Sequence, residues 1–364
     1  MPSVTVHCMN AFLLSVVATI VMVNVAPRIG LVDVPAGRKR HDGRIPLVGA
    51  GVFVAFCIAS LFLQQQPDGF PLMLIGMALI VLLGVFDDIR DLRALFRLGA
   101  QCGIVALVVV PNGLLIRNAG PLLGDQPILL LQWALPVTIF AVVGMVNALN
   151  LIDGLDGLAG GISIVALMWF TLAAALLGVA EELPLLLVLC SCILGFLVFN
   201  FRHPWRARAA AFLGDGGSMM LGLALAFTAI SLTQRSGREL PPVTALWICA
   251  LPVIDTLSLI FRRLGAGDNI FAADRRHLHH LLLDTGLSVS HTVLILVAVS
   301  AALGGFGIAG WLLGVSDRFM LLGLTVPLAL HSWFALYGVK HLHVSRASLA
   351  TRAIATPQWV QRTE

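Results

Sequence analysis

Long apolar runs, each bounded by charged residues, Pro or Gly, dominate the chain from end to end. There are eleven of them, at about 7–26, 45–63, 70–86, 97–111, 128–146, 159–180, 183–200, 212–233, 242–260, 291–313 and 319–338. Most are close to the roughly 20 residues that an α-helix needs to cross a bilayer. Helical periodicity adds nothing here, because a helix that faces lipid is apolar on every side. The pattern predicts an all-α, polytopic integral membrane protein with about 11 transmembrane helices.

The composition agrees with this fold class and excludes others. Of 364 residues, 59% are hydrophobic even without the 35 glycines, and only 12% are charged, against about 25% in ordinary soluble domains. A soluble globule and a disordered chain are both excluded. A net charge of +4 is too small for a surface that tracks phosphates, so we expect no nucleic-acid partner. The six cysteines form no Cys-x-x-Cys pair, which predicts reduced, buried thiols.

Positive charges are distributed unequally between the two sides of the predicted bundle. Nineteen of the 23 Lys and Arg lie in the loops after the odd-numbered spans and in the C-terminal segment, and four lie in the opposite loops. Because cytoplasmic loops are enriched in Lys and Arg, this distribution places the C-terminus in the cytoplasm and the N-terminus outside. Most of the unusual polar residues share the cytoplasmic side, so we expect the chemistry there.

The first polar motif closes the third span, with Asp87, Asp88 and Asp91 separated by helical spacings. A continuing helix would gather these three carboxylates on one side, where the negative end of the helix dipole opposes them. Either Arg90 or Arg93 neutralises them, or they bind a divalent cation. Since Mg²⁺ is commonly held by one or two carboxylates together with phosphate oxygens, the position at a membrane boundary favours the cation.

The second motif repeats a polar residue at every third position, with Asn147, Asn150, Asp153 and Asp156, and each Asp is followed by Gly. Positions three apart drift by about 60° per step around an ideal helix, so all four converge only if the helix unwinds into a turn. A surface Asp-Gly turn explains one such pair. It does not explain four polar residues beside apolar spans, so we expect a binding or catalytic role.

The third motif, residues 212–218, is a glycine-rich turn that opens the eighth span and contains Asp215. Backbone N–H groups at a helix start bind anions. Asp215 either caps the helix or holds a metal whose other ligands are phosphate oxygens.

The fourth motif is the loop 261–290, which carries Arg262, Arg263, His277, His279 and His280. Three histidines within four residues beside arginines predict phosphate contact or proton transfer. Zinc is the alternative, although oxygen ligands nearby favour harder ions. Weaker signals are the ionisable Asp255 inside a span, the polar Asn200 at a span end, and the basic segment 38–44 with Lys39, which either binds substrate or anchors the protein at anionic lipid.

Carboxylates without thiolates suit Mg²⁺, glycine-rich turns with Arg and His suit phosphates, and surrounding spans suit a substrate with a long apolar tail. The combination indicates phosphoryl transfer between a cytosolic nucleotide and a lipid phosphate. At these motifs the chain resembles the polyprenyl-phosphate N-acetylhexosamine-1-phosphate transferases, most closely the WecA type. The matching segments are 38–41 with 45–49, 87–91, 147–161, 212–218, 242–247 and 274–280.

The resemblance implies that UDP-N-acetylglucosamine and undecaprenyl phosphate react to give undecaprenyl-diphospho-N-acetylglucosamine and UMP, with Mg²⁺ or Mn²⁺. We expect a bacterial inner-membrane enzyme with a periplasmic N-terminus, which starts a cell-surface polysaccharide and can form a homodimer. Residues 1–340 would form one catalytic membrane domain, with active-site loops at about 27–44, 87–97, 147–158, 201–212 and 261–290. Residues 341–364 would form a cytoplasmic tail.

Under this hypothesis each candidate residue receives a role. The expected catalytic residues are Asp87, Asp88, Asp153, Asp156 and His279. Asp215, Asp87 and Asp88 are the expected metal ligands. The expected substrate-binding residues are Asn147, Asn150, Arg262, Arg263, His277, His280, Lys39 and Asn200.

Two alternatives stay open at this point. Within the family, the sugar can be another UDP-N-acetylhexosamine, such as a 6-deoxy sugar. Outside it, a transporter for a divalent cation or a lipid-linked intermediate is the rival class. A transporter would place its ligands near the middle of the membrane on broken helices, whereas these motifs cluster at span ends.

Overall fold

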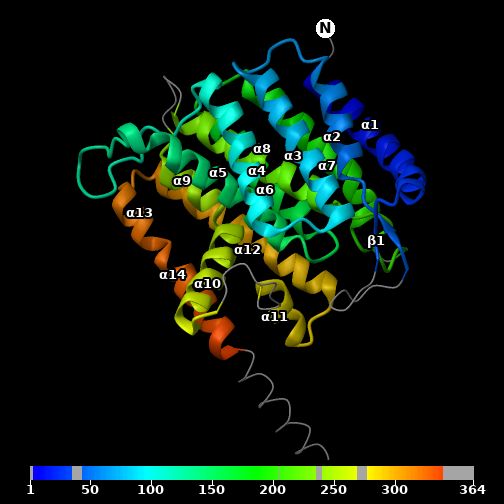
Figure 1. Cartoon of the computed structure of the whole chain (residues 1–364). Coiled ribbons are helices and arrows are strands. Elements are labelled where there is room, and N and C mark those ends of the chain that lie inside the picture. The colour runs from blue at the N-terminus through cyan, green and yellow to red at the C-terminus, as the bar shows by residue number, and fades with distance from the viewer. Residues whose placement is uncertain (1–2, 35–42, 204, 235–239, 269–276, 339–364) are drawn as a thin grey trace, which may run out of the picture.

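Helices account for nearly all of the regular structure. The computed structural model describes residues 3–34, 43–203, 205–234, 240–268 and 277–338, and Figure 1 shows their arrangement. The α-helices are α1 (Val4–Val25), α2 (Gly49–Ser60), α3 (Phe70–Arg90), α4 (Ala94–Asn112), α5 (Ala134–Ile152), α6 (Leu158–Leu176), α7 (Glu182–Asn200), α8 (Gly214–Gln234), α9 (Pro242–Ile248), α10 (Ala250–Ala266), α11 (Leu278–Asp284), α12 (Val289–Leu312), α13 (Asp317–Gly323) and α14 (Thr325–Trp333). Short helical turns lie at Ala26–Ile29, Leu131–Trp133 and Phe334–Gly338, and β1 (Val32–Asp33) pairs antiparallel with β2 (Ile45–Pro46).

Among the described residues, nine helical segments are long and apolar enough to cross a membrane. α9 and α10 meet at 83°, so the predicted span 242–260 is a bent pair. The predicted span 45–63 contains only the 12-residue α2, which at 1.5 Å per residue is about 18 Å long. That length is well below the roughly 30 Å of a bilayer core. The class of polytopic helical membrane protein is confirmed, and the count of eleven spans stays a prediction.

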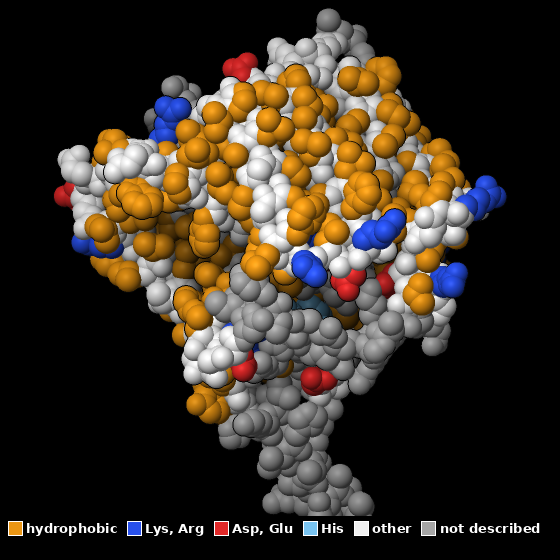
Figure 2. Space-filling model, in the orientation of Figure 1, with side chains coloured by type: hydrophobic (Ala, Val, Ile, Leu, Met, Phe, Trp, Pro, Cys, Tyr) orange, Lys and Arg blue, Asp and Glu red, His pale blue; other side chains and the backbone are white. Residues whose placement is uncertain are grey.

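The surface of the bundle is unusually apolar. Hydrophobic side chains cover most of the upper part of the face seen in Figure 2, and several charged side chains gather along its lower border. Leu82, Leu107 and Phe140 are each more than half exposed. In water so much exposed apolar surface would promote association, whereas lipid tails solvate it.

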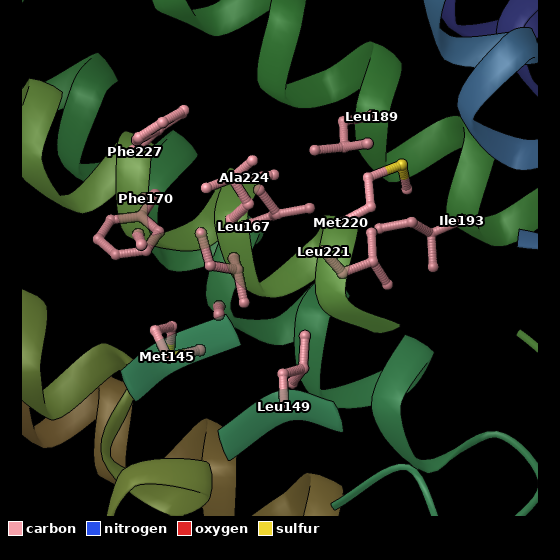
Figure 3. Close-up of a cluster of buried hydrophobic side chains, with 14 of the residues drawn as sticks. Met145, Leu149, Leu167, Phe170, Leu189, Ile193, Met220, Leu221, Ala224 and Phe227 are labelled. Atoms are coloured by element: carbon pink, nitrogen blue, oxygen red, sulfur yellow. The ribbon is translucent and has the colours of Figure 1, made fainter. Parts of the chain in front are cut away.

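α8 is the most deeply buried of the candidate spans, with 89% of its apolar window covered by other parts of the chain. Figure 3 shows side chains of α5, α6 and α7 converging on it, including Leu149, Phe170 and Ile193. Close packing fixes its first turn against α3, because a Cβ atom added at Gly84 would overlap the backbone of Gly216. The start of α8 is therefore held rigidly beside the end of α3.

An extended segment leads into α8 and is held by backbone hydrogen bonds to the last residue of β2 and to the residues that follow it. The N–H of Phe212 donates to the Pro46 carbonyl over 2.9 Å, and the N–H of Val48 donates back to Phe212 over 2.9 Å. Gly214 follows with a left-handed φ of 71°, which a glycine adopts without strain. This turn delivers Asp215 to the first turn of α8.

Candidate active site

Polar residues from three helix ends meet at one end of the bundle. Asp87 and Asp88 lie in the last turn of α3, Asn150 in the last turn of α5 and Asp215 in the first turn of α8. The opposite end is marked by Glu182 in the first turn of α7, whose carboxylate accepts a hydrogen bond from the last turns of α8. The site therefore lies at helix ends and not midway along the bundle.

Asp87 is buried, and both of its carboxylate oxygens have partners. Its Oδ1 accepts the backbone N–H of Leu92 over 2.9 Å, and its Oδ2 pairs with the guanidinium of Arg97 in the first turn of α4. α3 does not continue past Arg90, because Asp91 takes a left-handed φ of 50° and is exposed. The predicted helical trio of carboxylates is thus wrong for Asp91, and Arg97 supplies the counter-charge in place of Arg90 or Arg93.

Asp88 and Asp215 are joined through the start of α8. The backbone N–H of Asp215 lies 3.1 Å from both carboxylate oxygens of Asp88, so Asp88 provides the anion that the helix start favours. Asp215 follows the first residue of α8 and is therefore not its N-cap. Its side chain instead faces Arg97, whose NH1 lies 3.8 Å from Oδ2.

The two asparagines of α5 connect the site to neighbouring helices. Asn150 donates to Asp215 Oδ1 over 2.8 Å and to Ser218 Oγ over 3.0 Å. Asn147, one turn earlier, donates over 2.7 Å to Gln101 of α4. Asn150 therefore orients a carboxylate of the cluster, whereas Asn147 ties α5 to α4.

The Asp-Gly turn begins where α5 ends at Ile152, as the sequence predicts. The carboxylate of Asp153 makes no hydrogen bond or ion pair with another described residue. Burial, followed by the nearby negative charges of Asp215, Asp88 and Asp156, raises its pKa to about 8. Such a group needs a cation or a proton, because the low-polarity surroundings penalise an isolated charge.

Asp156 and Asn200 hold this turn in place. Asp156 pairs with the Arg202 Nε over 2.6 Å and accepts the N–H of Ala209 over 3.2 Å. The Asn200 oxygen accepts the N–H of Gly157 over 2.7 Å, and its amide donates to the Ala211 carbonyl over 2.8 Å. Both predicted site residues thus contact protein backbone.

His279 lies directly against the Asp-Gly turn. A Cβ atom added at Gly154 would overlap its Nε2. The ring is 1% exposed, and neither nitrogen has a hydrogen-bond partner among the described residues. Burial and then the nearby His280 lower its pKa to about 3. His279 is therefore a neutral imidazole that the fold presses onto the residue after Asp153.

The other two histidines flank this ring. The rings of His277 and His279 are stacked with centroids 5.8 Å apart, and His280 approaches His279 to 4.2 Å. His277 also contacts the buried Asp255, with Nδ1 2.7 Å from Oδ2. If His277 binds substrate as predicted, it must do so while its Nδ1 contacts the buried Asp255.

Arg262 and Arg263 lie near the end of α10, which packs on α5. The Arg262 Nε donates to the Ser258 carbonyl on its own helix over 3.2 Å, and Arg263 is buried. Lys39 lies outside the described residues.

The side chains of the site provide oxygen donors for the expected divalent cation. In the described part of the chain, no three His, Cys, Asp or Glu residues are grouped closely enough to hold a metal alone. Mg²⁺ does not need such a group, since one or two carboxylates, waters and substrate phosphates usually complete its shell. Asp88 and Asp215 offer hard oxygen donors without any thiolate nearby, so they fit a site completed by a phosphate substrate.

The sequence did not identify Arg97 as a site residue. There it was only one of the nineteen Lys and Arg residues assigned to the cytoplasmic side. It lies in the first turn of α4, with its Nε buried and without a partner among the described residues. A usable signal was present, because an Arg at the start of an apolar run is costly unless it is paired.

Comparisons with known proteins agree with this architecture. The model for Glycosyl transferase family 4 matches residues 70–233. A relative from Yersinia pestis, named undecaprenyl-phosphate alpha-N-acetylglucosaminyl 1-phosphate transferase, is 35% identical and covers 86% of both chains. A relative of the same name from Haemophilus influenzae is 33% identical over 94% of both chains. Another from Escherichia coli strain K12 is 30% identical over 84% of this chain and 83% of the relative.

The fold and the site together define a polytopic membrane protein with an acidic, phosphate-compatible site at one end of its bundle. The extent of the similarity then assigns the family. This chain belongs to glycosyl transferase family 4.

Proposed function

We propose that this protein transfers N-acetylglucosamine 1-phosphate from UDP-N-acetylglucosamine to undecaprenyl phosphate. The observation that carries the proposal is the cluster of Asp87, Asp88, Asp153 and Asp215, with Arg97 against it, at one end of an apolar bundle. Such a site suits two phosphate substrates, one of which has a long apolar tail. The name shared by the relatives describes the same transfer.

The chemistry is an exchange of phosphoanhydride bonds. An oxygen of the lipid phosphate attacks the sugar-linked phosphorus, the bond from that phosphorus to UMP breaks, and UMP leaves with the electron pair. One such bond is made and one is broken, so no external energy source is required. The main obstacle is repulsion between two anionic substrates, and fixed positive charge is the principal means of reducing it.

Asp88 and Asp215 would hold Mg²⁺, or Mn²⁺ in its place, near Asp87. When bound, the ion supplies positive charge to the diphosphate. Arg97 adds a cation fixed by Asp87, with NH1 3.8 Å from Asp215 Oδ2. Asn150 orients Asp215 by its hydrogen bond of 2.8 Å, so the metal ligand is positioned before substrate arrives.

Asp153 is the better candidate for accepting a proton from the lipid phosphate. Both Asp87 oxygens already have partners, whereas the Asp153 carboxylate has none among the described residues and its pKa is raised to about 8. A base works best when its pKa lies near the working pH. His279 would support the turn that carries Asp153 as a neutral group, and Arg262, Arg263, His280 and Lys39 would bind the diphosphate or the sugar.

The distribution of Lys and Arg supports a cytoplasmic site, a periplasmic N-terminus and a cytoplasmic C-terminus, in eleven spans of a bacterial inner membrane. The position of the acids at helix ends disfavours the transporter alternative. The product would begin a cell-surface polysaccharide. Another UDP-N-acetylhexosamine is the alternative donor, selected by the loop after residue 261.

The test uses purified protein with undecaprenyl phosphate and a panel of radiolabelled UDP-sugars. We expect equal amounts of UMP and lipid-linked sugar, with N-acetylglucosamine preferred and no turnover in chelator. Asp215→Asn should lower turnover by about 10²–10³-fold, whereas Asp125→Asn, in the loop before α5, should not. Full activity and unchanged Mg²⁺ dependence in Asp215→Asn would remove the metal assignment. No UMP from any sugar would overturn the function.

A further inference from the structure

A second buried polar cluster joins the last helical segment of the chain to the histidine motif. Its centre is Asp255 on α10, which is 1% exposed. Its Oδ2 lies 2.7 Å from His277 Nδ1, and its Oδ1 accepts the N–H of Leu278 over 2.8 Å and lies 2.9 Å from His331 Nε2. One carboxylate thus contacts three donors from two other segments, α14 and the start of α11.

We propose that His331 is a positioning residue for the active site, acting through Asp255 on the histidine motif. This inference rests on the proposed function only for its activity readout. All three side chains of the cluster, those of Asp255, His277 and His331, lie outside residues 70–233, which the family model matches.

Asp255 is a buried carboxylate whose position depends on the donors around it. A carboxylate in an apolar interior is costly unless donors surround it. His331 fills one of three donor positions around Asp255 and is itself 7% exposed. Removing this donor leaves an oxygen of Asp255 short of a partner, so the carboxylate should shift toward water or its remaining donors.

Asp255 is connected to the active site through the start of α11. Asp255 holds both the side chain of His277 and the first N–H of α11 at Leu278. The next residue, His279, packs on Gly154 of the Asp-Gly turn, with its ring stacked on that of His277. A shift of Asp255 should therefore displace the start of α11 and move the His279 ring from its place beside Asp153.

A second contact between the same two helices allows the role of His331 to be distinguished from simple helix packing. α14 contacts α10 at a neighbouring point, where the hydroxyls of Ser332 and Ser258 lie 3.0 Å apart. α10 and α14 run side by side in the lower part of Figure 1. Ser332→Ala disturbs the same packing without touching Asp255, so it is the matched control for His331.

The experiment compares His331→Leu, His331→Gln and Ser332→Ala in the full-length protein in detergent. Two quantities are measured, namely hydrogen exchange of the α11 amides and steady-state transfer with separate kcat and KM values. We expect His331→Leu to raise exchange over residues 278–284 and to lower kcat at least tenfold, with KM for the UDP-sugar changed less than threefold. His331→Gln keeps a donor and should recover most of both, and Ser332→Ala should match the wild type.

The outcomes are distinguishable. Equal exchange and kcat in His331→Leu and Ser332→Ala would overturn the proposal, as would failure of His331→Gln to recover any of the loss. A fall in folded fraction with unchanged kcat per folded molecule would also overturn it, because it indicates a structural role alone. If the wild type released no UMP, the proposed function would fail. The hydrogen-exchange measurement would still show whether the contact between His331 and Asp255 orders α11.

Discussion

Replacing Gly154 with alanine places a methyl group where the His279 ring now lies. The added Cβ would overlap Nε2 and lie 2.9 and 3.0 Å from the ring carbons Cε1 and Cδ2. Ordinary carbon contacts are about 3.5–4.0 Å, so the ring must move by roughly 1 Å. The backbone of residue 154 is not left-handed, and alanine therefore adds no backbone strain of its own.

The expected loss follows from this displacement. Misplacing a group at an active site by about 1 Å can cost around 10²-fold in rate, which corresponds to about 2.7 kcal/mol of activation free energy. Overpacking a buried site also costs about 1–3 kcal/mol of stability. Activity should accordingly be expressed per folded molecule, from the release of UMP by purified protein whose folded fraction is measured in parallel.

Two comparisons isolate the cause. Gly144→Ala lies on α5 with no atom within 4 Å of the added methyl group, so it should keep nearly full turnover. In a His279→Ala background, adding Gly154→Ala should cause little further loss, because the ring that the methyl group displaces is gone. Wild-type activity in Gly154→Ala, or an undiminished loss in the His279→Ala background, would refute the reasoning.

Three further outcomes follow from the site. Arg97→Ala should reduce UMP release per folded molecule by about 10²–10³-fold, the usual cost of removing one fixed group that stabilises charge in a transition state, and a near-normal rate would show that Arg97 is dispensable. Asn200→Ala should lower the unfolding temperature with KM unchanged, since both of its hydrogen bonds go to backbone; a raised KM with normal stability would instead support substrate binding. Between pH 3.8, the ordinary pKa of its carboxyl group, and about pH 8, Asp153 carries a proton in the folded protein but not in the unfolded chain. With a chelator present, the free energy of unfolding should therefore fall as pH rises through this range. Thermal unfolding should show that stability falls less with pH in Asp153→Asn, and in the wild type with excess Mg²⁺. Equal dependence of stability on pH in all three samples would contradict this.

The sequence predicted the helices well where a run of apolar residues is uninterrupted. The run at 183–200 corresponds to α7 at Glu182–Asn200. The apolar run at 242–260 predicted one continuous span, whereas the chain bends after Ile248. Pro252 gives a physical reason for the bend. A proline has no N–H for the carbonyl four residues earlier and its ring clashes there, so a straight helix cannot continue through that point.

The site was predictable in its residue types and less so in its contacts. The convergence of Asp87 with Asp215 follows from motifs that end one span and begin another. The pairing of Arg97 with Asp87 and the capping of α8 by Asp88 depend on how α3, α4 and α8 pack. The contact between Asp255 and His331 joins residues 76 positions apart, and no local pattern indicates such a partner.

The charge balance of the site explains why a cation and the nucleotide should bind together. Asp88 and Asp215 face the site, Asp153 adds a further charge once it has lost its proton, and Arg97 is already shared between Asp87 and Asp215. Two like charges 4 Å apart repel by about 4 kcal/mol at an effective dielectric constant near 20, so a diphosphate cannot enter such a cluster unaided. A divalent cation reverses this interaction, and each ligand must then raise the affinity for the other by the same factor. The acids that make the empty site unfavourable for phosphate would thus make the proposed enzyme dependent on a divalent cation.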